Sequence, residues 1–136
     1  MYLIAFRPEY QITVEPTRNR IFYKHYAELA QAQDLPEYLA DWQLALAAMQ
    51  PGFTILSDMT DLPVVSDQLA ELIGRAQQLV IGLGVRQVAA VHAPGSETYH
   101  ISETVRAEAE LPMRIFTDLW EADRYLDELT PREAAI

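Results

Sequence analysis

The chain has 136 residues, of which 50% are hydrophobic and 22% are charged, a composition typical of a folded globular protein rather than a disordered one. A chain of this length most simply folds as one domain. We expect residues 1–136 to form it, with a core over about 10–129 and a frayed tail at 130–136. The chain contains no cysteine, which excludes disulfides, thiolate metal ligands and cysteine nucleophiles.

The net charge of −10 is unevenly distributed. Residues 1–25 carry four basic and two acidic side chains, whereas the rest of the chain carries 6 basic and 18 acidic ones. An acidic body of this kind repels phosphate backbones and anionic lipid surfaces. The charge therefore argues against a nucleic-acid partner.

The N-terminus has none of the features of an export signal. The stretch MYLIAFRPEY lacks a basic region before its apolar run, and that run is too short for a signal peptide. No window of the chain approaches the ~20 apolar residues that span a bilayer. We expect a cytoplasmic protein with no membrane insertion.

Two β-rich segments, 10–15 and 21–26, come first in the chain. Both are rich in β-branched and aromatic residues, and the segment 16–20 between them, PTRNR, has the composition of a turn. Asn19 is suited to a left-handed backbone conformation there. The pattern predicts an opening β-hairpin.

The first helix is expected to begin around Asp34, whose side chain can cap it while Glu37 reaches back in a capping box. Pro36 fits the first turn of a helix, where its missing N–H costs nothing. Pro51 and Gly52 end the helix. Between these two ends, apolar residues repeat at spacings of four and three, which predicts one buried stripe along the helix: Leu35, Leu39, Trp42, Leu46 and Met49.

A short buried strand at 53–56 leads through a polar loop into a long amphipathic helix that starts near Ser66. Gly82 and Gly84 end this helix. Its predicted inward face consists of Leu69, Leu72, Ile73, Ala76, Leu79, Val80 and Leu83.

The last part of the chain repeats the alternation. Segment 86–91 predicts a strand covered on both faces, 97–110 a third helix and 113–116 a final strand. Asp118 and Glu121 predict a capping box for the last helix. Its inward face is expected to be Leu119, Ala122, Leu126 and Leu129.

The resulting order, β-β-α-β-α-β-α-β-α, predicts a single α/β domain. Strand–helix alternation indicates parallel strands joined by right-handed crossovers, and the opening hairpin adds an antiparallel pair. We therefore expect a mixed, mostly parallel sheet with helices packed against it.

The loop after the central strand is the densest polar cluster in an otherwise apolar region. In open α/β sheets, ligands bind just beyond the carboxyl ends of the strands. The loop has no metal-ligand spacing, glycine-rich phosphate cradle or nucleophile elbow, so we expect no metal and no cofactor. The candidate binding or regulatory residues are Ser57, Asp58, Thr60, Asp61, Ser66, Asp67 and, after the next strand, His92.

The order of elements, with LSDMTDL after a central strand and RIFTDLWEADRYLDEL at the close, resembles the STAS-like superfamily, which includes the anti-sigma-factor antagonists. The closing residues Phe116, Asp118, Glu121-Ala122 and Tyr125-Leu126 are similar to the end of its stand-alone bacterial branch. The resemblance covers about residues 10–129 and implies this fold and a role in regulated protein interaction.

In the phosphorylated members of that superfamily, an Asp ends a strand and a Ser that begins the next helix is modified by a partner kinase. Asp58 and Ser66 match these two positions. The Asp-Ser-Ser-Gly type signature is missing, the connection 59–65 is long, and Asp67 would repel an added phosphate. The alternative for Ser66 is an ordinary helix N-cap.

Three functions remain open at this stage. The first is a non-catalytic protein-interaction or regulatory module, and the second is a domain that binds a small molecule or lipid between helices and sheet. The third is an enzyme that uses His92, the best general-base candidate, or Asp58.

Trp120 and Tyr125 lie off the inward stripe of the last helix and are candidate interface residues. The segment 10–15 is a candidate edge strand, and open edges pair with other chains. We therefore also expect a homodimer formed through apolar surface.

Overall fold

The computed structural model describes residues 1–27, 35–61, 66–96 and 111–129. Within these ranges, six strands form one sheet whose order across the sheet is the order in the chain. The first three strands, β1 (Tyr2–Phe6), β2 (Tyr10–Glu15) and β3 (Arg20–His25), pair antiparallel. From β3 onward, β4 (Thr54–Asp58), β5 (Gln87–Val91) and β6 (Met113–Phe116) pair parallel. The predicted α/β class and mixed sheet are confirmed.

Strand β1 was missed by the sequence analysis, which placed the sheet edge at residues 10–15. The structure corrects this, because β2 lies between β1 and β3 and the edge is β1. A five-residue apolar segment has no clear alternation, so its strand character comes from pairing with β2 rather than from a pattern of its own. The pairing carries an irregularity between Leu3 and Ala5, a β-bulge in the edge strand.

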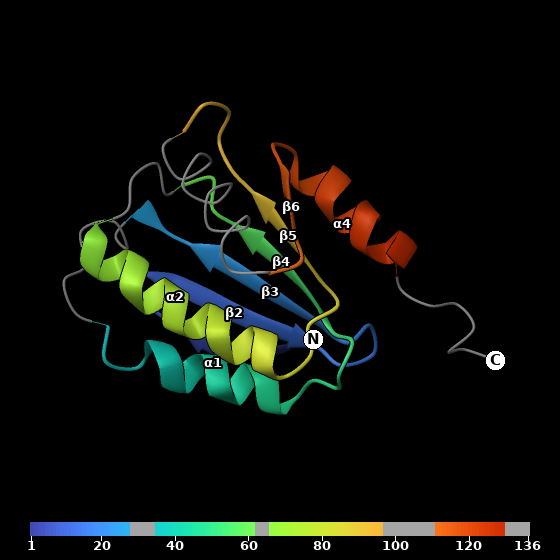
Figure 1. Ribbon diagram of the computed structural model, residues 1–136, viewed down its shortest axis with the longest axis horizontal. Coiled ribbons are helices and arrows are strands. Elements are labelled where there is room, and N and C mark those ends of the chain that lie inside the picture. The colour runs from blue at the N-terminus through green and yellow to red at the C-terminus, as the bar shows by residue number, and fades with distance from the viewer. Residues whose placement is uncertain (28–34, 62–65, 97–110, 130–136) are drawn as a thin grey trace.

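The helices form two layers, one on each face of the sheet (Figure 1). Helices α1 (Tyr38–Ala47) and α2 (Asp67–Gly82) lie side by side over one face and enclose the larger core with residues such as Ile12, Ile21 and Ile55. Helix α4 (Leu119–Leu129) packs on the opposite face over β4, β5 and β6. The third helix predicted at 97–110 lies outside the described residues. Among the described residues, no helix is long and apolar enough to cross a membrane.

Helix α1 begins later than the capping-box pattern predicts. Its N-cap is Glu37, whose side chain makes no capping hydrogen bond. Asp34 lies outside the described residues. Glu37 instead forms an ion pair with Arg7, which follows β1, so the carboxylate is drawn toward the sheet rather than toward the first turn of the helix.

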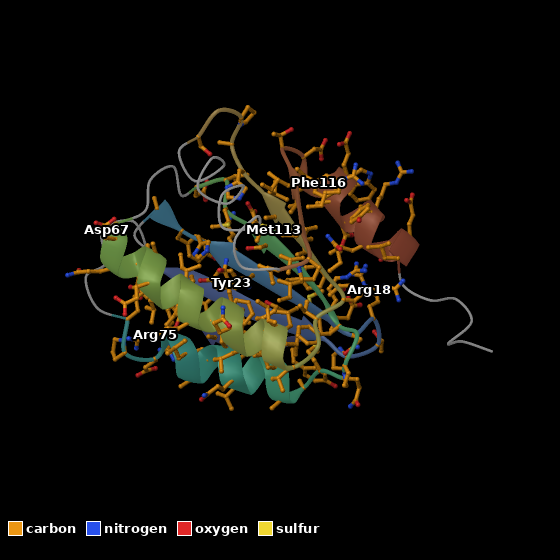
Figure 2. All side chains as sticks on the ribbon, in the orientation of Figure 1. Arg18, Tyr23, Asp67, Arg75, Met113 and Phe116 are labelled. Atoms are coloured by element: carbon orange, nitrogen blue, oxygen red, sulfur yellow. The ribbon has the colours of Figure 1, made fainter. Side chains whose placement is uncertain are left out.

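The predicted inward faces are largely correct, with two exceptions at helix ends. Leu83 follows the last residue of α2 and is exposed, and Leu119, the first residue of α4, is 46% exposed. Ala122 and Leu126 are fully buried and hold α4 on the sheet. Aromatic side chains contribute to the cores on both faces of the sheet: Tyr23 lies in the core under α1 and α2, and Phe116 packs against the core under α4 (Figure 2).

Candidate functional site

A groove of about 580 Å³ lies between the start of α4 and the strands β2, β3 and β4. Because side chains alternate between the two faces of a strand, its lining comes from one face of β2, β3 and β4 and from the start of α4. Apart from Tyr23, whose ring packs in the core on the other face, the residues that line it are Gln11, Thr13, Phe22, Lys24, Leu56, Asp58, Asp118, Leu119, Trp120 and Asp123.

The middle of the groove is apolar. Phe22 and Leu56 form its floor, on the face of the sheet where Leu56 also packs against α4. Leu119 and Trp120 form one wall from the first turn of α4, and Trp120 is 71% exposed. A tryptophan exposed to this extent costs free energy in water, and such residues are common at binding surfaces.

One end of the groove is polar and lies at the carboxyl ends of β3 and β4. Lys24, the single lysine of the chain, donates from Nζ to Asp58 Oδ2 at 3.3 Å and lies 3.5 Å from Asp61 Oδ2. Thr60 donates to Asp58 Oδ1 from its amide at 3.1 Å and from its hydroxyl at 2.7 Å. The predicted loop residues Asp58, Thr60 and Asp61 are thus brought together around Lys24.

These contacts fix the charges at that end. Partial burial alone would raise the pKa of Asp58, but the hydrogen bonds from Thr60 and the charge of Lys24 outweigh burial and hold the pKa below its ordinary value. Partial burial also lowers the pKa of Lys24, yet the neighbouring charge of Asp58 wins and raises it. Both groups are charged at neutral pH, and neither is prepared for proton transfer.

An ion-pair cluster anchors α4 beside the groove. Arg20 is fully buried and donates from Nε to Thr54 Oγ1 at 3.1 Å and from Nη1 to Asp123 at 3.0 Å and Asp127 at 2.8 Å. Arg18, labelled in Figure 2, reaches Asp127 at 2.9 Å from the hairpin turn. The cluster contacts α4 at Asp123 and Asp127, beyond the first turn of the helix.

Ser66 and Asp67 lie away from the groove, at the N-terminus of α2. Ser66 Oγ accepts a hydrogen bond from the amide of Leu69 at 3.2 Å, which confirms the predicted position of Ser66 at the helix N-cap. Asp67 is the first residue of α2, where the positive end of the helix dipole stabilises its negative charge. Both side chains are exposed.

Ser57 and His92 point to the opposite face of the sheet from Asp58. Ser57 is paired in register with Tyr23 of the larger core, and His92 follows Val91, which faces α4. His92 lies close enough to the buried His25 of β3 to affect its titration. The two candidate enzymatic residues, His92 and Asp58, therefore lie on different sides of the sheet.

The two histidines are held neutral. Burial, with the neighbouring His92 adding to it, lowers the pKa of His25 to about 3, and burial lowers the pKa of His92 to about 4. An imidazole with such a pKa is a weak base at neutral pH. Among the described residues, no three His, Asp or Glu side chains gather in a way that would hold a metal ion.

The two interface candidates in α4 have different surroundings. Trp120 is exposed at the groove, whereas Tyr125 is half-buried against Phe116, with ring centroids 5.4 Å apart, and under the guanidinium of Arg114. Trp120 is therefore the one of the two that is free to contact a partner.

A smaller cavity of about 150 Å³ opens where the β1–β2 turn meets the start of α1. The Arg7 guanidinium there donates to Asp41 at 2.6 and 3.0 Å, and Tyr10 donates to the same carboxylate at 2.5 Å. Partial burial of Asp41 is outweighed by these donors, so its pKa lies below the ordinary value. The cavity is smaller than typical ligand sites, and its Arg7, Tyr10 and Glu37 side chains are engaged in the contacts around Asp41 and Arg7.

Sequence reasoning missed most of the groove. Gln11, Thr13, Phe22, Lys24 and Leu119 were assigned to strands or to the core, not to a site. The available signal was the alternation in residues 10–15, which places Gln11 and Thr13 on the face opposite the buried Tyr10, Ile12 and Val14.

Comparison of the chain with protein-family models, with curated proteins and with solved structures found no match in any of the three.

Proposed function

We propose that this protein is a non-catalytic binding module whose working surface is the groove between α4 and the sheet, and that its ligand is a segment of a partner protein. The observation that carries the proposal is the groove itself, about 580 Å³ with an apolar floor, a wall of Leu119 and Trp120, and a charged end at Lys24 and Asp58. Apolar centres with polar rims are typical of protein interfaces.

The resemblance to the STAS-like superfamily supports an interaction or regulatory role. Ser66 is exposed at the N-terminus of a 16-residue helix, where a phosphate would meet free amides. The neighbouring Asp67 opposes such a modification. We assign Ser66 to capping and place the binding function in the groove, and we assign no reaction to His92 or Asp58.

A small apolar ligand is the second candidate occupant. The groove volume falls within the roughly 300–1,000 Å³ of small-molecule sites, and its lining is mainly apolar with few polar groups. Native mass spectrometry of the purified protein distinguishes the two occupants, because a copurified small molecule adds its mass to the 15.4 kDa chain.

Substitution of Leu119 tests whether the groove is the binding surface. Leu119→Asp introduces a charge into the wall and should weaken any binding there by about tenfold or more. Leu44→Asp is the matched control, because Leu44 is a 60% exposed leucine on α1, on the other side of the sheet. Equal binding by both variants in isothermal titration calorimetry would refute the groove as the site.

A further inference from the structure

Three side chains lie in a row where β3, β4 and β5 reach the carboxyl edge of the sheet (Figure 1). His25 is the last residue of β3, and Met59 and His92 directly follow β4 and β5. In each strand the preceding residue is paired in register across the sheet. The amide of Met59 also donates to the carbonyl of Val91 at 2.8 Å, so the pairing continues past the end of β4. His25, Met59 and His92 are therefore neighbours on adjacent strands, and we call them the edge row.

The edge row faces the larger core, on the side of the sheet away from the groove. The ring of His25 packs against Tyr23, with centroids 4.3 Å apart, and Met59 belongs to the same core. Val91 lies in the core under α4, so the alternation along β5 turns His92 to the other face. His25 is 2%, Met59 9% and His92 0% exposed. The three side chains are thus buried together on one face.

One nitrogen of the edge row is buried without a partner. His25 Nδ1 has no hydrogen-bond partner among the described residues. Burying such an atom costs free energy, and a ligand that engages its lone pair removes that cost. Burial first, and then the nearby His92, lower the pKa of His25, so the two rings are close enough to interact.

Two imidazole rings and a thioether form a set of neutral, soft ligands. In the described part of the chain, no Asp or Glu joins the two histidines to make a group of three, and the chain has no cysteine. Neutral ligands leave the charge of a buried ion uncompensated, which costs more for a divalent ion than for a monovalent one. Thioether sulfur and imidazole nitrogen suit copper, and thioether sulfur selects Cu(I).

We propose that His25, Met59 and His92 bind one Cu(I) ion at the carboxyl edge of the sheet. The Cα atoms of two residues that are two strands apart are about 10 Å from each other, so the two rings can converge on an ion held over Met59. Each ligand comes from a different strand, and therefore no ligand spacing in the sequence indicates the site. The site is independent of the groove and of what the groove binds.

The test measures Cu(I) binding by the intact chain under anaerobic conditions. The probe is Cu(I) held by bicinchoninate, a chelator whose copper complex is coloured. We expect one equivalent of Cu(I) to pass from the chelator to the protein, and Zn²⁺ at the same concentration not to displace it. X-ray absorption at the copper edge should show both nitrogen and sulfur ligands.

Conservative variants show which side chains hold the ion. Met59→Leu removes the sulfur at nearly constant volume and should weaken Cu(I) binding by at least about tenfold, with loss of the sulfur signal. His25→Phe keeps a ring in place and should also weaken binding. Met49→Leu is the matched control, because Met49 is equally buried and precedes Gln50, which is bound to Asn19 in the turn before β3, at the opposite end of the sheet. Circular dichroism of each variant confirms that it is folded.

Four results would overturn the proposal. The first is that no Cu(I) passes to the protein from bicinchoninate. The second is equal Cu(I) affinity in Met59→Leu and Met49→Leu, which would exclude the thioether as a ligand. The third is displacement of Cu(I) by Zn²⁺, which would refute the choice of ion. The fourth is loss of Cu(I) binding in Leu119→Asp, which would place the ion in the groove.

Discussion

The two buried histidines should make the protein less stable in mild acid. In the unfolded chain a histidine binds a proton below about pH 6.5, whereas in the folded protein His25 and His92 bind one only near pH 3 and 4. Between these values the unfolded chain binds more protons, so stability falls as the pH falls from about 6.5 to about 4. The slope approaches about 1.4 kcal/mol per pH unit for each histidine.

Urea unfolding at several pH values between 7.5 and 4.5 measures this slope. His25→Phe removes one of the two titrating groups and should flatten the dependence by about one proton. The carboxylates with lowered pKa values, Asp41 and Asp58, lose their charge below this window and do not obscure it. An unchanged slope in His25→Phe would show that His25 is accessible to protons in the folded state.

The N-cap of α2 should contribute measurably to stability. Ser66→Ala removes the oxygen that accepts from the amide of Leu69 and should cost about 1 kcal/mol. Ser66→Asp keeps an acceptor at the same position and should retain most of the stability. Thermal unfolding compares the three proteins, and a Ser66→Ala midpoint equal to that of the parent chain would contradict the capping role.

Local conformation at single residues was predictable where one backbone constraint decides it. Asn19 has φ 52°, as its turn position indicated, and its side chain is further fixed by hydrogen bonds with the backbone of Gln50. Glu37 was not predictable, because its partner Arg7 is 30 residues away in the sequence. A local capping pattern says nothing about a competing charge brought close by the fold.

At the scale of elements, the attachment of α4 depends on Arg20. Arg20→Met removes the buried cation that pairs with Asp123 and Asp127 and leaves those carboxylates facing the sheet, so we expect a loss of about 2–3 kcal/mol in the free energy of unfolding. Arg75→Met is the control, because Arg75 forms an exposed ion pair with Glu71 on α2, and it should cost less than about 0.5 kcal/mol. Chemical denaturation measures both, and equal losses would mean that the buried cluster does not hold α4.

Most elements follow from the sequence because their periodicity is long enough to be unambiguous. Helix α2 starts at Asp67 and ends at Gly82, as its stripe and glycines indicated, and β6 has the predicted bounds. Strand β1 is the exception, because five apolar residues fit several structures and only the neighbouring β2 selects one.

At the scale of the whole molecule, self-association remains a prediction, but the structure changes which apolar surface would form the interface. On the groove side of the sheet, the exposed apolar residues among those described include Leu3, Phe6, Leu119 and Trp120, whereas Tyr125 is half-buried and strand β2 is not an edge. Salt screens repulsion between like-charged copies, so we expect a 15.4 kDa monomer at low salt and an increasing dimer fraction at high salt. Sedimentation equilibrium measures the dimer fraction. A monomer at every salt concentration would refute the dimer.

The location of the site was only partly predictable. The carboxyl edge of the sheet was expected, and Asp58, Thr60 and Asp61 do gather there around Lys24. The assignment of each strand residue to one face depends on the register and on which helix covers that face. Asp58 is the last residue of β4 and His92 follows β5, yet they lie on opposite sides of the sheet, and no spacing in the sequence indicates this.

The order of the strands has a consequence for how the molecule is made. Because every strand pairs with its neighbour in the chain, the sheet can grow from β1 to β6 in the order of synthesis, without a gap held open for a later strand. The antiparallel strands β1, β2 and β3 pair locally, which favours fast folding, whereas the parallel partners Arg20 and Thr54 are 34 residues apart in the sequence. The last unit to join is β6 with α4, so the groove is completed only when the C-terminal part of the chain arrives, and a nascent or truncated chain would hold a sheet without a binding surface.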